Sequence, residues 1–301
     1  MRTPIAVLTL LVGALLFIGT YTATPYNPTA SARDVPASTI GKAAASVEEA
    51  REQLLASYEV TPGTYVDRGF VVDNVLHAGD VGDIHYSLLV PESYDVTRPV
   101  ALFVTLRAEP GLYYQGLGAN LRVEEFAFTA QAYDANMIIA APQPNDWEQT
   151  SADQIVELTE YLLVAYDIDP ERVYLEGYSY GGETLSLVMD TKPGLFRAAL
   201  HCASQWDGGV EALAEARVPL RISLGDDDEF YTVEAAREVV EELRALYRAQ
   251  GLAEDEIDRL VVLDVKDASY FADWPWGGGQ HGSGSPLMAR DPEILGWLFA
   301  Q

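Results

Sequence analysis

Ser179 lies in Gly177-Tyr178-Ser179-Tyr180-Gly181, a Gly-x-Ser-x-Gly pattern that follows a short apolar run. In this pattern the serine sits on a tight strand-to-helix turn, which raises its hydroxyl above the end of the sheet. The flanking glycines leave room for the turn, because a Cβ at either position would crowd it. A serine hydroxyl is a weak nucleophile at neutral pH. The chemistry therefore needs a base within hydrogen-bonding reach and a carboxylate that orients the base.

Of the four histidines, His281 is the best candidate for this base. For a nucleophile on such a turn, the partners follow along the chain in the order serine, acid, histidine. His77 and His85 precede Ser179, and His201 falls inside a predicted strand. His281 follows the last predicted strand in a glycine-rich segment, and active-site groups of open parallel sheets gather at strand ends. We therefore expect His281 in a loop at the carboxyl edge of the sheet.

An acidic run is positioned to supply the third group. The predicted strand Leu220–Leu224 continues into Gly225 and then into four consecutive carboxylates, Asp226 to Glu229. Four neighbouring carboxylates cannot all face one imidazole. One of them is expected to orient the histidine, and the others are expected to be solvated.

The elements that must position these groups follow from the hydrophobic pattern. Continuous apolar runs are typical of parallel strands that are covered on both faces. From residue 100 onward such strands alternate with helices, which predicts an α/β fold with a mostly parallel sheet and helices on both faces. The longest predicted helices are 151–165, which opens with the capping box Ser151–Gln154, and 232–250. The predicted strands are Phe70–Val75, Asp83–Val90, Val100–Leu106, Met137–Ala141, Val173–Glu176, Ala198–Ala203, Leu220–Leu224 and Leu260–Val265.

Composition limits the classes of partner. The chain has 301 residues, with 46 Asp and Glu against 19 Lys and Arg, and a net charge of −27. Such an acidic surface repels nucleic acid and anionic membranes. Cys202 is the single cysteine, so no intramolecular disulfide can form, and its apolar strand context indicates an inert core thiol.

The N-terminal residues 1–32 have the pattern of a leader segment. Their apolar run, Ile5 to Ile18, is short for a bilayer span, and Ala30-Ser31-Ala32 offers small residues for cleavage. We expect a secretory signal peptide and an extracellular protein. The alternative is an uncleaved anchor that leaves the protein on the membrane, facing outside. A linker and short helix are expected over 33–64, and one catalytic domain over 65–301.

Together these patterns resemble the α/β-hydrolase superfamily, and within it the bacterial esterase and prolyl-oligopeptidase-like group. The resemblance covers roughly residues 65–300 and implies an α/β-hydrolase fold. The similar stretches are His85–Tyr94, Ala141–Trp147, Gly225–Tyr231, Leu263–Asp267 and the segment around His281.

The resemblance also ranks the candidate acids. A Gly-x-x-Asp turn is usual in related enzymes, which favours Asp228, with Asp226 as the second choice. Some relatives place the acid one strand earlier, which makes Asp207 a third.

Two backbone N–H groups are expected to stabilise the oxyanion of an acyl-transfer reaction. One belongs to Tyr180, the residue after the nucleophile. By position in the family the other belongs to Glu109, with Ala108 as the alternative. Many relatives have several glycines in this second turn, and the segment Leu106–Gly111 departs from that pattern.

The resulting hypothesis is a secreted serine hydrolase that cleaves carboxylic esters through an acyl-enzyme, with Ser179, His281 and Asp228 as its triad. It requires no metal and no organic cofactor, and its partner is a small ester. A small extracellular peptidase of the prolyl-oligopeptidase-like type is the alternative, acting on a peptide by the same mechanism. The length leaves no room for the β-propeller of prolyl oligopeptidases, which favours the ester. A non-catalytic binding protein on the same fold is the third possibility.

Several aromatic residues fall in predicted loops at strand ends, where they could line a substrate pocket. Each of them could equally cover an edge of the core. The run Trp274–Gly279, which leads into His281, is the best candidate for a pocket wall. The residues are Tyr113, Tyr114, Trp147, Trp206, Trp274 and Trp276.

Overall fold

The structure, a computed structural model, describes residues 49–108, 118, 120–122, 125–144 and 146–301. The chain divides into two compact units, Met1–Tyr58 and Glu59–Gln301. In the first unit residues 49–55 are helical, and the predicted leader over 1–32 lies outside the described residues. The second unit contains the sheet, which begins at Glu59, within the segment predicted as linker and short helix.

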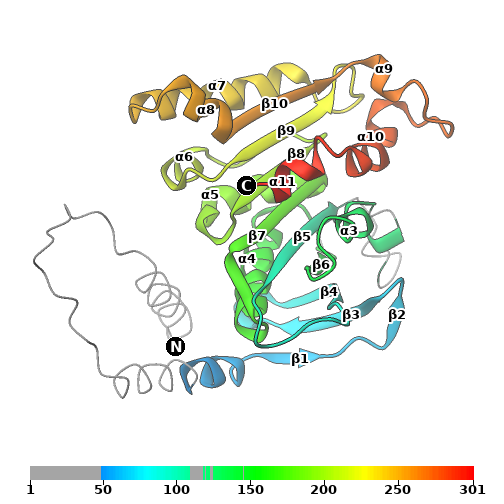
Figure 1. Cartoon of the computed structure of the whole chain (residues 1–301), viewed down its shortest axis with the longest axis vertical. Helices are drawn as coiled ribbons and strands as arrows, with labels where there is room; N and C mark the ends of the chain where they lie inside the picture. Colours follow the sequence, from blue (N-terminus) through cyan, green and yellow to red (C-terminus); the bar gives the residue numbers. More distant parts are fainter. Residues whose placement is uncertain (1–48, 109–117, 119, 123–124, 145) are drawn as a thin grey trace, which may run out of the picture. The chain divides into compact units, whose positions relative to one another are not determined.

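Ten strands of the second unit form one sheet (Figure 1). Their order is β1-β3-β4-β6-β5-β7-β8-β9-β10, with β2 paired to β3. The strands from β6 to β10 in this order pair in parallel, whereas β1 to β4 pair antiparallel and β4 meets β6 antiparallel. The mostly parallel sheet predicted from the sequence is confirmed. The strands are β1 (Glu59–Thr61), β2 (Tyr65–Asp67), β3 (Phe70–His77), β4 (Asp83–Leu89), β5 (Val100–Ala108), β6 (Ile138–Pro142), β7 (Ile168–Ser179), β8 (Ala198–Cys202), β9 (Leu220–Gly225) and β10 (Val261–Lys266).

Helices cover both faces of this sheet. Phe103 of β5 and Tyr174 of β7 pair in register and both contact Phe299, with ring centroids 5.3 and 5.2 Å apart. Leu106 lies three residues after Phe103 and so faces the opposite side, where a helix packs against it. One face carries α4 (Gln149–Ala165), α5 (Tyr180–Thr191), α6 (Glu211–Ala216) and α7 (Val233–Ala249), and the other carries α3 (Glu125–Ala130), α10 (Gly279–Arg290) and α11 (Leu295–Phe299). The remaining helices are α8 (Glu254–Leu260) and α9 (Ala268–Phe271).

Hydrophobic burial explains why β5 and β7 form the centre of the sheet. All of Ala101 to Leu106 is fully buried, as expected for a strand covered on both faces. A cluster of buried side chains, including Phe103, Tyr178, Phe126 and Leu298, fills the space between the sheet and the α3, α10 and α11 layer. Within the residues described, the helices are too short or too polar to cross a membrane.

Two predictions about helices are wrong. The helix expected from the capping box at Ser151 begins two residues earlier, at Gln149, and the Ser151 hydroxyl donates to Asp146 Oδ1 (2.6 Å) instead of capping it. The glycine-rich segment around His281, expected to be a loop, forms the first turn of α10. This segment is helical because of tertiary contacts, since its glycines and Pro286 are poor helix formers.

Gly181 allows α5 to pack directly against β5, and we predict that Gly181→Ala destabilises the fold. A Cβ at this position would collide with the backbone carbonyl of Leu106, which cannot move without shifting β5. Overpacking of this kind costs about 1–3 kcal/mol, which corresponds to a melting temperature lower by roughly 3–10 °C. Calorimetry of the variant checks this.

Gly194→Ala is the matched control, because among the described residues no atom beyond the chain neighbours lies within 4 Å of a Cβ built at Gly194. Its melting temperature should equal that of the wild type. Equal melting temperatures for all three proteins would show that the contact at Gly181 can relax without cost.

Candidate active site

Ser179 occupies a strained turn at the carboxyl end of β7. The strand ends at Ser179 and α5 begins at Tyr180, so no loop separates them. Ser179 has φ 57° and ψ −131°, a conformation that residues with a Cβ rarely adopt. Gly177 and Gly181 make it possible, since a Cβ at Gly177 would collide with the Gly181 carbonyl. Such strain persists where the surrounding packing enforces it, and it is frequent at functional sites.

The structure brings Ser179, His281 and Asp228 into one hydrogen-bonded chain. Ser179 Oγ lies 3.0 Å from Nε2 of His281, and Nδ1 of His281 lies 3.0 Å from Oδ2 of Asp228. The Asp228 side chain is 1% exposed and that of His281 is 13% exposed. A carboxylate at Nδ1 favours the tautomer with its proton on Nδ1, which leaves Nε2 as an acceptor towards the serine hydroxyl.

The second oxygen of Asp228 ties the carboxylate to its own turn. Oδ1 accepts the backbone N–H groups of Phe230 (3.0 Å) and Tyr231 (3.1 Å). The other two candidate acids have different partners. Asp226 Oδ1 accepts from the Gln280 side chain at 2.8 Å, and Asp207 Oδ1 accepts from the Gln205 side chain at 2.9 Å.

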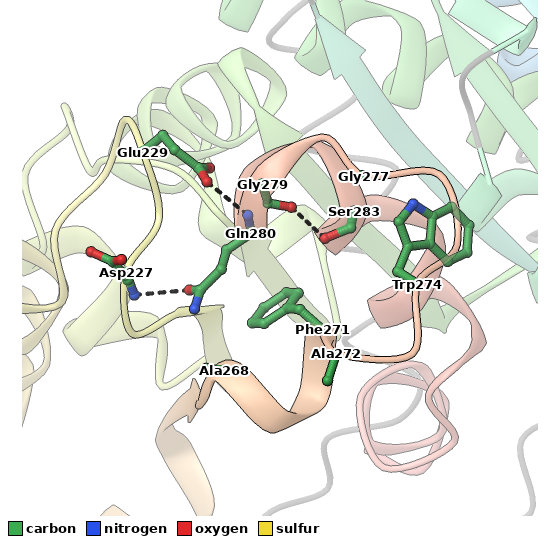
Figure 2. A pocket seen from close by; sticks show the side chains of 10 residues that line it. All are labelled: Asp227, Glu229, Ala268, Phe271, Ala272, Trp274, Gly277, Gly279, Gln280 and Ser283. Carbon is green, nitrogen blue, oxygen red and sulfur yellow. Dashed lines mark hydrogen bonds between the residues drawn. The ribbon is translucent and has the colours of Figure 1, made fainter.

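Glu229 fixes the backbone that carries His281. Its two carboxylate oxygens accept the N–H groups of Gln280 and His281, each at 2.9 Å, and Figure 2 shows the carboxylate directed at the start of α10. These N–H groups belong to a first helical turn and have no partner within the helix. Partial burial would raise the pKa of Glu229, but the hydrogen bonds from His281 and Gln280 outweigh it and lower that pKa. Glu229 and Asp226 are exposed, as predicted for the remaining carboxylates, but both also hydrogen-bond to the first turn of α10.

A cavity of about 290 Å³ lies on the Gln280 side of the α10 N-terminus (Figure 2). Trp274, one of the predicted pocket aromatics, lines this cavity. None of the three residues Ser179, Asp228 and His281 is among the lining residues that the structure describes. The lining residues are Asp227, Glu229, Ala268, Phe271, Ala272, Trp274, Gly277, Gly279, Gln280 and Ser283.

Of the backbone donors predicted to stabilise the oxyanion, the structure describes only some. Tyr180 is the first residue of α5, and Ala108 lies opposite Ser179 in the parallel register of β5 and β7. The predicted donor Glu109 lies outside the described residues. Arg107, for which no role was predicted, places its guanidinium carbon 4.7 Å from the centroid of the Tyr178 ring. Within the described part of the chain, its buried Nε and Nη1 atoms have no hydrogen-bond partner.

Aromatic side chains surround the nucleophile and the histidine. The rings of Trp147 and Tyr180 lie 4.4 Å apart, which places one predicted pocket aromatic beside the residue that follows Ser179. Phe230 is 73% exposed and its ring lies 4.9 Å from that of His281. Of the other predicted aromatics, Trp206 contacts buried His201, Trp276 contacts Trp274, and Tyr113 and Tyr114 lie outside the described residues.

A second polar pair, Tyr231 and Glu183, reaches Ser179 and was not predicted. The Tyr231 hydroxyl donates to Glu183 Oε1 at 2.9 Å, and the nearby Ser179 hydroxyl acts to lower the pKa of Tyr231. Burial, followed by the charge of Glu183, raises that pKa above its ordinary value. Two spacings could have indicated the pair: Glu183 lies one helical turn after Ser179, and Tyr231 lies three residues after Asp228.

The other histidines have separate partners. Buried His201 donates through Nε2 to the Gln205 carbonyl at 3.0 Å, and burial lowers its pKa to about 4. Nδ1 of His85 lies 2.6 Å from Asp73, and Nδ1 of His77 lies 2.8 Å from Asp83.

Comparison with known families gives one match within the chain. Residues 143–208 match the family model described as the prolyl oligopeptidase family. This segment contains α4, β7, the turn at Ser179 and α5, which are the elements that place the nucleophile.

Several solved structures share the fold. A thermostable esterase is 23% identical with a TM-score of 0.60, and the match covers 77% of this chain but 63% of that one, so the chain spans less than two thirds of that esterase. A glucuronoyl esterase from Teredinibacter turnerae is 12% identical with a TM-score of 0.54, covering 99% of this chain and 100% of that one. An S-formylglutathione hydrolase from Staphylococcus aureus is 15% identical with a TM-score of 0.50, covering 78% and 100%. The chain therefore has the α/β-hydrolase fold, and its segment around Ser179 is similar to the prolyl oligopeptidase family.

We predict that Glu229→Ala lowers the reactivity of Ser179 although Glu229 contacts neither Ser179 nor the histidine ring. Without the carboxylate, the first turn of α10 loses two hydrogen bonds and the His281 ring moves away from Ser179 Oγ. A misplacement of this kind reduces reactivity about 10- to 100-fold. The rate at which a fluorophosphonate labels Ser179 measures the effect.

Asp227→Asn is the control for this experiment. Asp227 has an exposed side chain and contacts Gln280 through its backbone N–H, which the substitution preserves. Its labelling rate should match the wild type. Equal rates for Glu229→Ala and wild type would mean that α10 keeps its place without the carboxylate.

Proposed function

We propose that this α/β-hydrolase-fold protein is a serine hydrolase that cleaves carboxylic esters through an acyl-enzyme. The observation that carries the proposal is the hydrogen-bonded chain from Ser179 Oγ through His281 to the buried Asp228, which starts on a strained turn. In this role Ser179 is the nucleophile, His281 is the general base and acid, and Asp228 orients the imidazole and stabilises its charged form.

The proposed reaction has two stages. Ser179 Oγ attacks the acyl carbon while its proton passes to His281 Nε2, and His281 then gives that proton to the leaving alcohol. A water molecule next attacks the acyl-enzyme with His281 again as the base, and Ser179 recovers its proton as the carboxylic acid leaves. The mechanism requires neither a metal nor an organic cofactor.

The oxyanion that forms in each stage needs donors aimed at it. The Tyr180 N–H at the start of α5 is the first proposed donor, helped by the partial positive charge of a helix N-terminus. The second proposed donor is a backbone N–H at the end of β5, from Glu109 or from Ala108. Arg107 supports this half of the site, because its guanidinium adds a positive charge at the end of the same strand.

A small serine peptidase is the second candidate, and the match of residues 143–208 to the prolyl oligopeptidase family favours it. The triad geometry is equally suited to cleaving an ester bond and a peptide bond. We favour an ester because the folds with TM-scores of 0.60 and 0.54 are both described as esterases. A non-catalytic binding role has less support, since binding alone requires no hydrogen-bonded triad.

We further propose that the protein acts outside the cytoplasm, with residues 1–32 as a cleaved signal peptide. The short apolar run and the small residues at Ala30-Ser31-Ala32 support this. Mass spectrometry of the protein expressed with its full leader is expected to find it in the medium, with its first residue at or close to Arg33. Recovery of the protein with Met1 or its leader intact in the membrane fraction would support the anchor instead.

Esterase activity is tested with a matched pair of substrates, a p-nitrophenyl ester and a p-nitroanilide of the same short acyl group. We predict turnover of the ester by the wild type and a loss of at least about 10⁴-fold in Ser179→Ala, because the nucleophile is removed. The anilide is expected to react no faster with the wild type than with Ser179→Ala.

Ser93→Ala, an exposed serine on another part of the domain, should retain full activity. Turnover of the anilide above the level of Ser179→Ala would favour the peptidase. Inactivity of the wild type on both substrates would favour the binding role.

A further inference from the structure

Tyr231 lies beside Ser179, and the triad mechanism assigns it no role. Its position is fixed from two directions. Its backbone N–H is bound by Asp228 Oδ1, and its hydroxyl is bound by Glu183, which is 3% exposed. Its ring lies 5.5 Å from that of His281, centroid to centroid. A tyrosine held this firmly beside a nucleophile presents its oxygen at a fixed point in the site.

The hydrogen bonds of Tyr231 have a defined direction. The phenol has one proton, which it donates to Glu183 Oε1. Burial and the Glu183 charge raise the pKa of Tyr231, so the phenol keeps its proton at neutral pH. Towards Ser179 its oxygen can therefore act only as an acceptor, and the nearby Ser179 hydroxyl acts to lower the pKa of Tyr231 against this rise. Ser179 thus has one acceptor within hydrogen-bonding distance, His281 Nε2 at 3.0 Å, a second nearby in Tyr231 Oη, and a single proton to offer.

In the acyl-enzyme, Ser179 Oγ has become an ester oxygen and has no proton left. Both acceptors then lose their donor. They also lie on one side of the nucleophile. Tyr231 and Asp228 follow β9, whereas the oxyanion donors are expected from α5 and β5. In the sheet β5 lies on one side of β7, and β8 followed by β9 lies on the other. A water molecule has two O–H groups, which match two acceptors left free on the same side.

We propose that Tyr231 Oη and His281 Nε2 together bind the water that hydrolyses the acyl-enzyme, with Glu183 holding the phenol in the accepting orientation. This inference rests on the proposed acyl-enzyme mechanism. One O–H of the water points at Tyr231 Oη, and the other gives its proton to His281 Nε2 as the oxygen bonds to the acyl carbon. The bond from Ser179 Oγ to that carbon then breaks, and Oγ takes the proton from His281.

The proposed water site predicts that water and an alcohol respond differently to the loss of Tyr231. Methanol has a single O–H, which must face His281 Nε2 in order to react, so its attack gains nothing from Tyr231. Loss of the phenol oxygen should therefore slow hydrolysis more than methanolysis. A purely structural role for Tyr231 would slow both reactions together.

The experiment follows a p-nitrophenyl ester by stopped flow, with methanol present, in wild type and Tyr231→Phe. The burst of p-nitrophenol reports acylation, and its rate should stay within about threefold of the wild type. The steady-state rate of free-acid formation should fall about tenfold, which is the effect expected from one lost hydrogen bond, while methyl ester formation should stay unchanged. The ratio of methyl ester to free acid should rise by about the same factor.

Two Glu183 variants test the orientation of the phenol. Glu183→Gln keeps an amide oxygen that can accept the phenol proton, so its product ratio should lie between those of wild type and Tyr231→Phe. Glu183→Leu removes the acceptor, and its ratio should approach that of Tyr231→Phe. Tyr133→Phe, which removes a partly exposed phenol remote from the site, should behave as wild type.

An unchanged product ratio in Tyr231→Phe, or equal losses in burst and steady-state rates, would overturn the inference. If the proposed hydrolase function itself is wrong, the experiment gives different results. In that case the wild type shows no burst, and a fluorophosphonate does not label Ser179. Labelling in both proteins together with an unchanged ratio refutes the water site and leaves the hydrolase mechanism standing.

Discussion

The position of His281 depends on the carboxylate of Glu229 at the start of α10. This helix contains several glycines and an internal proline, and such a segment has little helical tendency of its own. A carboxylate at a helix N-terminus binds free N–H groups and complements the helix dipole. The adjacent Asp228 binds the imidazole from the same turn. Both the backbone and the ring of His281 are therefore anchored to the residues that follow β9.

This constraint explains why part of the site follows from sequence and part does not. Ser179 could be located because its turn demands glycines at fixed spacings, and those glycines are visible in the chain. Asp228 and His281 could be proposed because parallel strands direct their carboxyl ends to one edge. The structure then brings these three side chains to hydrogen-bonding distance.

The helical state of α10 could not be predicted, because it depends on contacts with Glu229, some fifty residues away in the chain. The local sequence, Gly277-Gly278-Gly279 followed by further glycines, favours a loop when taken alone. The pairing of Tyr231 with Glu183 was missed for the same reason, since the two residues lie 48 positions apart. Strand cores were predicted well because they are continuous apolar runs. Strand ends were less certain: β7 begins at Ile168, and its polar residues Asp169 to Arg172 gave no apolar signal.

The three residues of the proposed triad lie far apart in the sequence. His281 lies 102 positions after Ser179 and 53 after Asp228. During synthesis the strained turn at Ser179 therefore emerges well before His281, its proposed base. Parallel strands that pair over long distances in the sequence also form slowly. A growing chain would carry an unactivated serine until α10 has docked. Proteolytic removal of the α10 segment would return the protein to that state. The proposed chemistry would therefore be acquired only when α10 docks, and it would be lost when α10 is removed.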